Sequence, residues 1–111
     1  MAAPDFQQIF DTLKEDVVKL VTLTVSTHRD QAIDDANAFL TVSRDKLEQY
    51  TRLLVTGDLA PDDFAWLVSG LKSLAKMELL LQVGLAKIRV DQFVQSLLSL
   101  ITDVIFRQVL A

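Results

Sequence analysis

The stretch that decides the fold is Leu54-Val55-Thr56-Gly57-Asp58-Leu59-Ala60-Pro61-Asp62-Asp63, near the middle of the 111-residue chain. Gly57 follows an apolar segment, where a helix ends most easily on a residue that can adopt a positive φ. Pro61 suits the first turn of a second helix, and the acids after it place negative charge at the positive end of that helix dipole. We therefore predict a helix-to-helix turn over residues 57–60, defined by Gly57, Asp58 and Pro61.

Helix is expected on both sides of this turn. Residues 5–56 contain neither glycine nor proline, and no proline follows Pro61. Apolar residues recur at helical spacing in both segments. One segment, Val21 to Ser26, alternates apolar and polar residues as a strand does, but a lone strand has no partner for its backbone hydrogen bonds. The sequence therefore predicts helix there too, kinked or frayed.

The two helical arms match in length. Arm one (5–56) has 52 residues and arm two (61–109) has 49, and either would extend ~75 Å as a continuous helix. A four-residue connection makes the flanking helices antiparallel neighbours. We predict an all-α fold, an antiparallel hairpin of two long helices forming a single helical domain over residues 1–111.

The apolar seam shifts around the helix once in each arm. In arm two it runs to Ile88 and resumes at Phe93, one residue later than the regular spacing requires, which is a rotation of ~100°. Arm one shows a comparable shift near residues 25–31. If the turn is centred between residues 58 and 59, His28 lies level with Arg89, so both seams shift at the same height.

Two arrangements fit these shifts. Either both arms are continuous, or both break near residues 26–31 and 84–92 and the hairpin folds over into a shorter four-helix bundle. Thr27 with Asp30 is a weak helix-start signal in arm one. Arm two offers only Gly84, which lies within the apolar pattern. This weaker signal in arm two favours continuous arms.

No catalytic, cofactor-binding or metal-binding site is predicted. The chain has no cysteine, and its single histidine, His28, has Ala32 where a second helical ligand would stand. Adjacent acids such as Asp34 and Asp35 point ~100° apart on a helix and do not chelate together. There is no Glu-x-x-His pattern of di-iron bundles and no glycine-rich phosphate loop. We expect no enzyme and no cofactor.

Charge and hydropathy indicate which partners and which cellular location to expect. A net charge of −4 without a basic cluster is poorly suited to the phosphate backbone, so nucleic acid is an unexpected partner. The longest segment without a charged residue, 92–102, has 11 residues, against ~20 needed to cross a bilayer. No basic segment followed by an apolar run opens the sequence, so we expect a cytoplasmic protein with no transmembrane segment.

The apolar stripe of arm two is wider than one partner helix covers, which predicts association. We expect the protein to bind itself, as a homodimer of hairpins forming a four-helix bundle or as a higher oligomer, or to bind another helical protein. The predicted interface comprises Leu67, Leu71, Leu74, Leu81, Leu85, Ile88, Phe93, Leu97 and Val104.

A polar seam accompanies this interface. Glu78 occupies a position where the pattern otherwise places leucine, and Gln82 and Arg89 follow on the same side. Together with a partly buried His28, these residues are either a device that fixes register and oligomer state or a hydrated edge.

The functional hypotheses follow from the association surface. The first is a non-enzymatic adaptor or scaffold protein that acts through helical self-association. The second is an amphipathic coat protein of a lipid or storage-granule surface, as phasins are, although interfacial helices usually carry Lys and Arg along the polar face. The third is a secreted helical hairpin. Proteins of that kind carry Trp-x-Gly at the turn, whereas Trp66 here lies inside arm two.

Overall fold

A computed structural model of the protein describes residues 5–110. The all-α class is confirmed, since the described residues contain helices and no strand. The elements are α1 (Phe6–Thr24), α2 (Arg29–Thr56), α3 (Pro61–Gly70), the 3₁₀ helix η1 (Leu71–Leu74), α4 (Glu78–Gln82) and α5 (Lys87–Val109).

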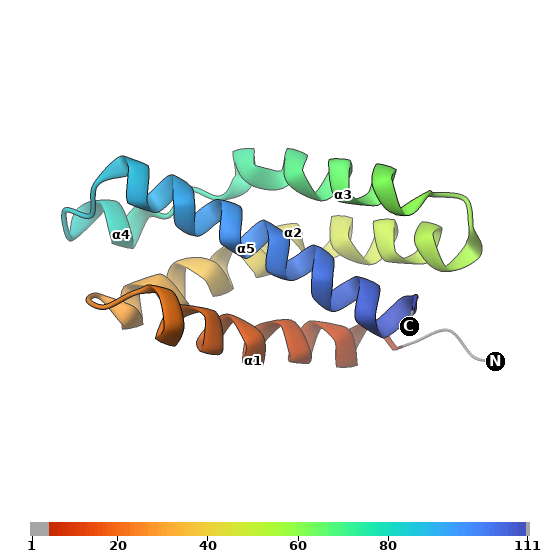
Figure 1. Ribbon diagram of the computed structural model, residues 1–111, viewed down its shortest axis with the longest axis horizontal. Coiled ribbons are helices and arrows are strands. Elements are labelled where there is room, and N and C mark those ends of the chain that lie inside the picture. The colour runs from red at the N-terminus through yellow and green to blue at the C-terminus, as the bar shows by residue number, and fades with distance from the viewer. Residues whose placement is uncertain (1–4, 111) are drawn as a thin grey trace.

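These elements form four columns that run alternately in opposite directions, with α3, η1 and α4 sharing the third column (Figure 1). The first column, α1, packs against α2 and α5, and α3 packs against the same two helices from the other side. The molecule measures 46 × 22 × 20 Å, and the 28-residue α2 spans most of the long axis at ~42 Å.

The expectation of continuous arms is wrong. Arm one ends its first helix at Thr24, and α2 begins at Arg29 and runs back along α1. The Thr22 and Thr24 hydroxyls donate to the carbonyls four residues earlier, an arrangement that often bends a helix. Val25 is then extended, with φ −115° and ψ 117°, so the strand-like segment frays into a connection.

Arm two breaks twice. The helix gives way after η1, where Met77 has φ 50°, and again after α4, where Gly84 has φ 87°. The apolar stripes explain the breaks: two continuous helices would leave much of each stripe in water, whereas folding over buries α1 against α5.

The central turn joins α2 to α3. Gly57 caps α2 at φ 83° and donates its N–H to the Leu54 carbonyl at 3.3 Å. The Thr56 hydroxyl donates to Asp58 Oδ2 at 2.8 Å, and Pro61 is the first residue of α3. Only glycine adopts this φ without strain, so the chain reverses here by local chemistry.

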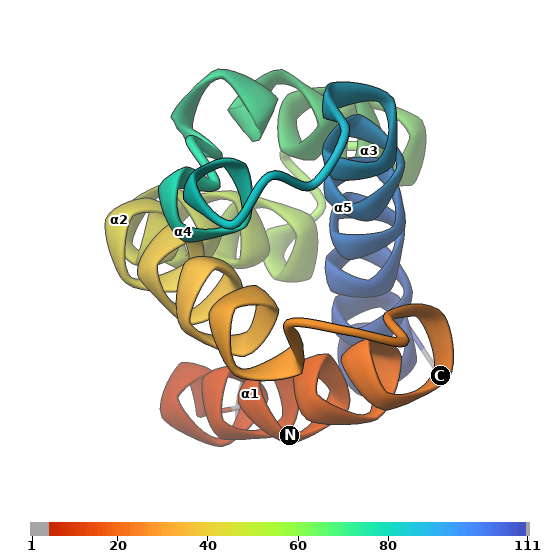
Figure 2. The same cartoon turned by 90° about the vertical axis from the view of Figure 1, so that its left-hand side faces the viewer.

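One hydrophobic core joins the columns, with buried residues from α1, α2, α3, η1, α4 and α5. Phe64 of α3 is fully buried, and its ring centroid lies 5.5 Å from that of Phe106 on α5. The core fills the space that the four columns enclose when viewed along the molecule (Figure 2).

Candidate functional site

The residues expected to form an interface are divided between the core and the surface. Leu71, Phe93, Leu97 and Val104 are buried within the chain's own core, and Leu67, Leu74 and Leu85 are half-buried. Leu81 and Ile88 are exposed, with 48% and 68% of their surface accessible. The folded-over arm supplies the partner that a second hairpin was expected to supply, so the nine residues do not share one open face.

The four residues of the expected polar seam are all exposed at the end of the molecule where the arms break. His28 precedes α2 at φ 58°, and Glu78 opens α4. The expected partial burial of His28 is wrong, because the break between α1 and α2 leaves it exposed. The exposure of Glu78 agrees with a hydrated edge, the second of the two alternatives for the polar seam. Gln82 ends α4 and Arg89 lies in the first turn of α5.

Asp35 is a buried carboxylate with a role that the sequence pattern does not show. It lies on α2, 7% exposed, and accepts hydrogen bonds from the backbone N–H groups of Leu79 at 3.1 Å and Leu80 at 2.8 Å. These are orphan donors of the first turn of α4, which has no side-chain cap of its own. Asp35 thus caps α4 from 44 residues away and fixes it to α2.

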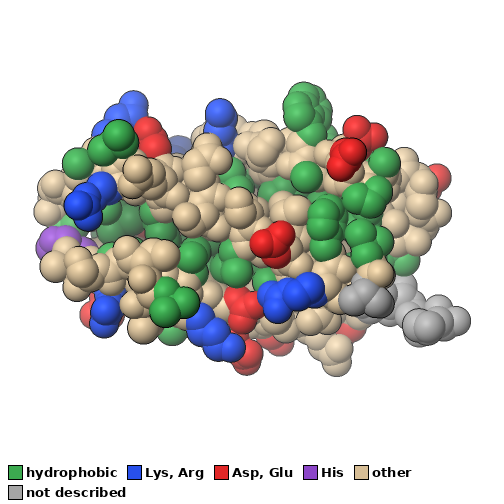
Figure 3. Space-filling model, in the orientation of Figure 1, with side chains coloured by type: hydrophobic (Ala, Val, Ile, Leu, Met, Phe, Trp, Pro, Cys, Tyr) green, Lys and Arg blue, Asp and Glu red, His purple; other side chains and the backbone are tan. Residues whose placement is uncertain are grey.

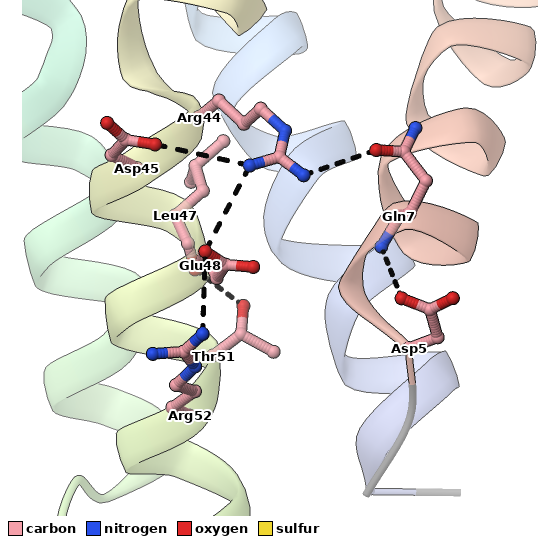
Figure 4. A network of polar contacts seen from close by, with 8 residues as sticks. All are labelled: Asp5, Gln7, Arg44, Asp45, Leu47, Glu48, Thr51 and Arg52. Carbon is pink, nitrogen blue, oxygen red and sulfur yellow. Dashed lines mark hydrogen bonds and ion pairs between the residues drawn. The ribbon is translucent and has the colours of Figure 1, made fainter.

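A polar network fixes the start of α1 to the middle of α2 (Figure 4). Arg44 donates to Gln7 Oε1 at 3.2 Å and lies 4.0 Å from carboxylate oxygens of Asp45 and Glu48. Its guanidinium also lies 5.4 Å from the Phe6 ring centroid. The contacts of Arg44 with Gln7 and Phe6 join α1 to α2, whereas its ion pairs with Asp45 and Glu48 stay within α2 and contribute little.

A surface cleft lies beside the junction of α3 and η1. It has a volume of about 540 Å³ and is lined from α2, α3, η1 and α5. Trp66 lies at this cleft with 73% of its surface exposed, and the half-buried Tyr50, Leu67 and Leu74 also line it. Hydrophobic atoms project from the molecular surface along α3 in the space-filling view (Figure 3).

The lining of this cleft includes a glycine and two lysines. Gly70 is in helical conformation at φ −66°, and a Cβ built on it would meet no atom within 4 Å. Gly70 thus lines the cleft without adding a side chain to it. The charged residues of the lining are Lys46 on α2 and Lys72 on η1, and no acidic side chain lines the cleft. This cleft is therefore locally basic on a chain of net charge −4.

The described part of the chain shows neither a metal-binding cluster nor a helix that could cross a membrane. Residues 5–110 contain no group of three or more His, Asp or Glu side chains placed to hold a metal ion. None of the helices within this range combines the length and the apolar character needed to cross a membrane. The surface cavities include this cleft and a second cavity at the end of the molecule where both arms break, which we call the broken end.

The similarity comparisons add no relative. No family model, curated protein or solved structure matches the chain.

Proposed function

We propose that the protein is a non-enzymatic adaptor whose cleft at α2, α3 and η1 receives an acidic amphipathic helix of a partner protein. The observation that carries this proposal is the exposure of Trp66, 73% accessible beside a cleft of about 540 Å³.

An exposed tryptophan is informative because of its size. Tryptophan has a large apolar surface and an N–H donor, and it is among the residues that contribute most to binding at protein interfaces. Trp66 is also the only tryptophan of the chain, whose other aromatic residues on α3 and α5, Phe64, Phe93 and Phe106, are buried or half-buried. Covering Trp66 together with Tyr50 would remove a continuous apolar surface from water.

The charge of the cleft supports an acidic partner. Lys46 and Lys72 lie at its edges with no acid beside them in the lining. An amphipathic helix that places apolar residues on Trp66 and Leu67 and acidic residues beside the two lysines is complementary in both respects. Two lysines are too few to bind a nucleic acid backbone strongly.

A second copy of the chain is the less favoured occupant. Apolar stripes too wide for two helices predict self-association, but the folded-over chain buries much of that surface in its own core. The chain is also acidic overall, so two copies repel each other at long range. Self-association is therefore one outcome of the test below.

Trp66 provides its own reporter. A synthetic 18-residue helix with leucine along one face and glutamate along both flanks is titrated into the protein while tryptophan emission is followed. We expect the emission to shift to shorter wavelength as Trp66 leaves water. The same peptide with lysine in place of glutamate is expected to bind at least tenfold more weakly.

Variants locate the site. With a labelled peptide followed by anisotropy, Trp66→Ala and the double variant K46E/K72E are expected to lose at least tenfold in affinity, as hot-spot residues do. Leu23→Ala is the matched control, because Leu23 is 85% exposed on α1. Equal binding of both peptides, or loss of affinity in the control, overturns the proposal.

Two further results also count against it. The first is an oligomer in light scattering, without peptide, that Trp66→Ala converts to monomer; the occupant is then a second copy. The second is co-sedimentation with phosphatidylcholine vesicles that depends on Trp66, which indicates a lipid-surface coat protein.

A further inference from the structure

A cavity of about 220 Å³ lies at the broken end of the molecule. Residues 24–27, α4 and the first turns of α5 line it, and this end faces the viewer in Figure 2. A single water requires ~10–15 Å³ on the same measure, so the space is large enough for a small organic molecule.

The walls of this cavity are apolar inside and polar at the rim. Leu80 and Phe93 are buried, and Val25 and Leu85 are half-buried beside them. The polar residues of the lining are exposed, apart from the half-buried Ser96: Thr24, Ser26, Thr27, Arg89, Gln92 and Ser96. Apolar walls with a few polar groups are typical of sites for small ligands.

Arg89 brings an unneutralised charge to the rim. No acidic side chain lines the cavity, and none of the ion pairs of residues 5–110 includes Arg89. By contrast, the nearby Arg29 donates to the carbonyls of Val25 at 2.8 Å and Thr22 at 3.5 Å. Arg89 is therefore the cation at this cavity with an uncommitted charge.

The first turn of α5 is positively charged, and the nearest acid on the helix, Asp91, follows that turn. The turn carries Lys87 and Arg89, no acidic residue, and an N-cap, Ala86, without a side-chain hydrogen bond. Cations at a helix N-terminus are unfavourable because the dipole is positive there. An anion at the cavity rim would offset this unfavourable charge, which supports an anionic ligand over a neutral one.

We propose that this cavity binds a small anionic amphiphile, a carboxylate with one short hydrocarbon chain. The carboxylate accepts hydrogen bonds from Arg89 and a rim hydroxyl such as that of Ser96, and the hydrocarbon chain packs on Leu80, Leu85 and Phe93. Because the cavity is built from the connections that interrupt both arms, bound ligand stabilises the folded-over chain.

The probe is octanoate. Octanol is the control ligand without the charge, and acetate is the control ligand without the hydrocarbon chain. All three are kept below the concentration at which octanoate aggregates. Octanoate is expected to raise the unfolding temperature in a saturable way, and the other two are expected to bind at least tenfold more weakly by calorimetry. Amide shifts in ¹⁵N spectra are expected within residues 24–27 and 80–96.

Arg89→Gln is expected to weaken octanoate binding by about tenfold or more, the usual effect of losing a charge-assisted hydrogen bond. Lys87→Gln is the control, since it removes the same charge from the same turn outside the cavity lining. Trp66→Ala must leave octanoate affinity unchanged, which separates this site from the peptide cleft.

Three results overturn the inference. These are equal affinity for octanol and octanoate, equal loss in the Arg89→Gln and Lys87→Gln variants, and amide shifts scattered over the whole surface. Ser96→Phe, which places a large side chain in the cavity, supplies a further check: if this variant folds, octanoate binding must fall.

Discussion

The two ends of the molecule reverse the chain in different ways. At one end, Gly57 takes the positive φ, its N–H is bonded to Leu54, and the Thr56 hydroxyl is bonded to Asp58. At the other end, Gly84 takes φ 87° after α4, but the connection from α1 to α2 places His28 at φ 58° without a side-chain cap. A residue other than glycine in this region costs ~1–2 kcal/mol.

The two ends are held by interactions of different range. The turn end is determined by residues within a few positions of one another. The broken end depends on contacts between distant elements, above all on Asp35 of α2 capping α4 and on Leu80 packed into the core. We therefore expect the broken end to open more readily than the turn end, which substitutions at each end can test.

The largest effect is expected at Leu80. Leu80→Ala removes a fully buried side chain of α4, which should lower the free energy of unfolding by ~2–5 kcal/mol in urea denaturation. Leu81→Ala, on the same short helix but 48% exposed, is expected to lower it by less than ~1 kcal/mol. Similar losses in both variants would show that α4 is not docked through Leu80.

The next effect is at Asp35. Asp35→Ala leaves the amides of Leu79 and Leu80 without their acceptor, and should destabilise the fold by ~1–3 kcal/mol. Asp34→Ala removes the same charge from an exposed neighbour and is expected to change stability by ~0.5 kcal/mol at most. Hydrogen exchange should quicken in residues 78–82 in the first variant; unchanged exchange there contradicts the capping role.

The smallest effects come from the backbone at the two reversals. Gly57→Ala is expected to destabilise by ~1–2 kcal/mol, because alanine is strained at φ 83°. His28→Gly is expected to change stability in the opposite direction by up to ~1 kcal/mol, as relief of strain exceeds the added freedom of the unfolded chain.

Gly70→Ala is the control for the glycine change. Gly70 is helical and has open space at its Cβ position, so alanine should stabilise by ~0.5–1 kcal/mol. Thermal unfolding of the three variants shows whether each substitution raises or lowers stability. If Gly57→Ala and Gly70→Ala both destabilise the protein, backbone conformation does not determine the difference between the ends.

How far the sequence predicts this fold depends on the range of each interaction. The near absence of glycine and proline from the arms and the spacing of their apolar residues are local features. They indicate the all-α class and the turn at Gly57. The shifts of the two seams mark the region of the breaks, since α1 ends at Thr24 and α5 begins at Lys87. The sequence nevertheless favours continuous arms, because Gly84 lies within an apolar pattern and gives no evident stop signal.

The remaining features could not be predicted from local pattern. Asp35 caps a helix 44 residues away, and no spacing rule connects the two. Met77 adopts a positive φ with its side chain 3% exposed, and no glycine or asparagine in the sequence marks that position. The sequence pattern did not single out Trp66 as a binding residue, since its exposure follows from how α3 is rotated against α2 and α5.

Small-angle scattering with a mass measurement tests the central claim, that one chain folds over into four columns. Our account predicts a monomer with a radius of gyration near the 14.1 Å of the Cα atoms and a longest dimension near 46 Å, each enlarged slightly by side chains and hydration. A particle with a longest dimension of ~75 Å, the length of an unbroken arm, would contradict it.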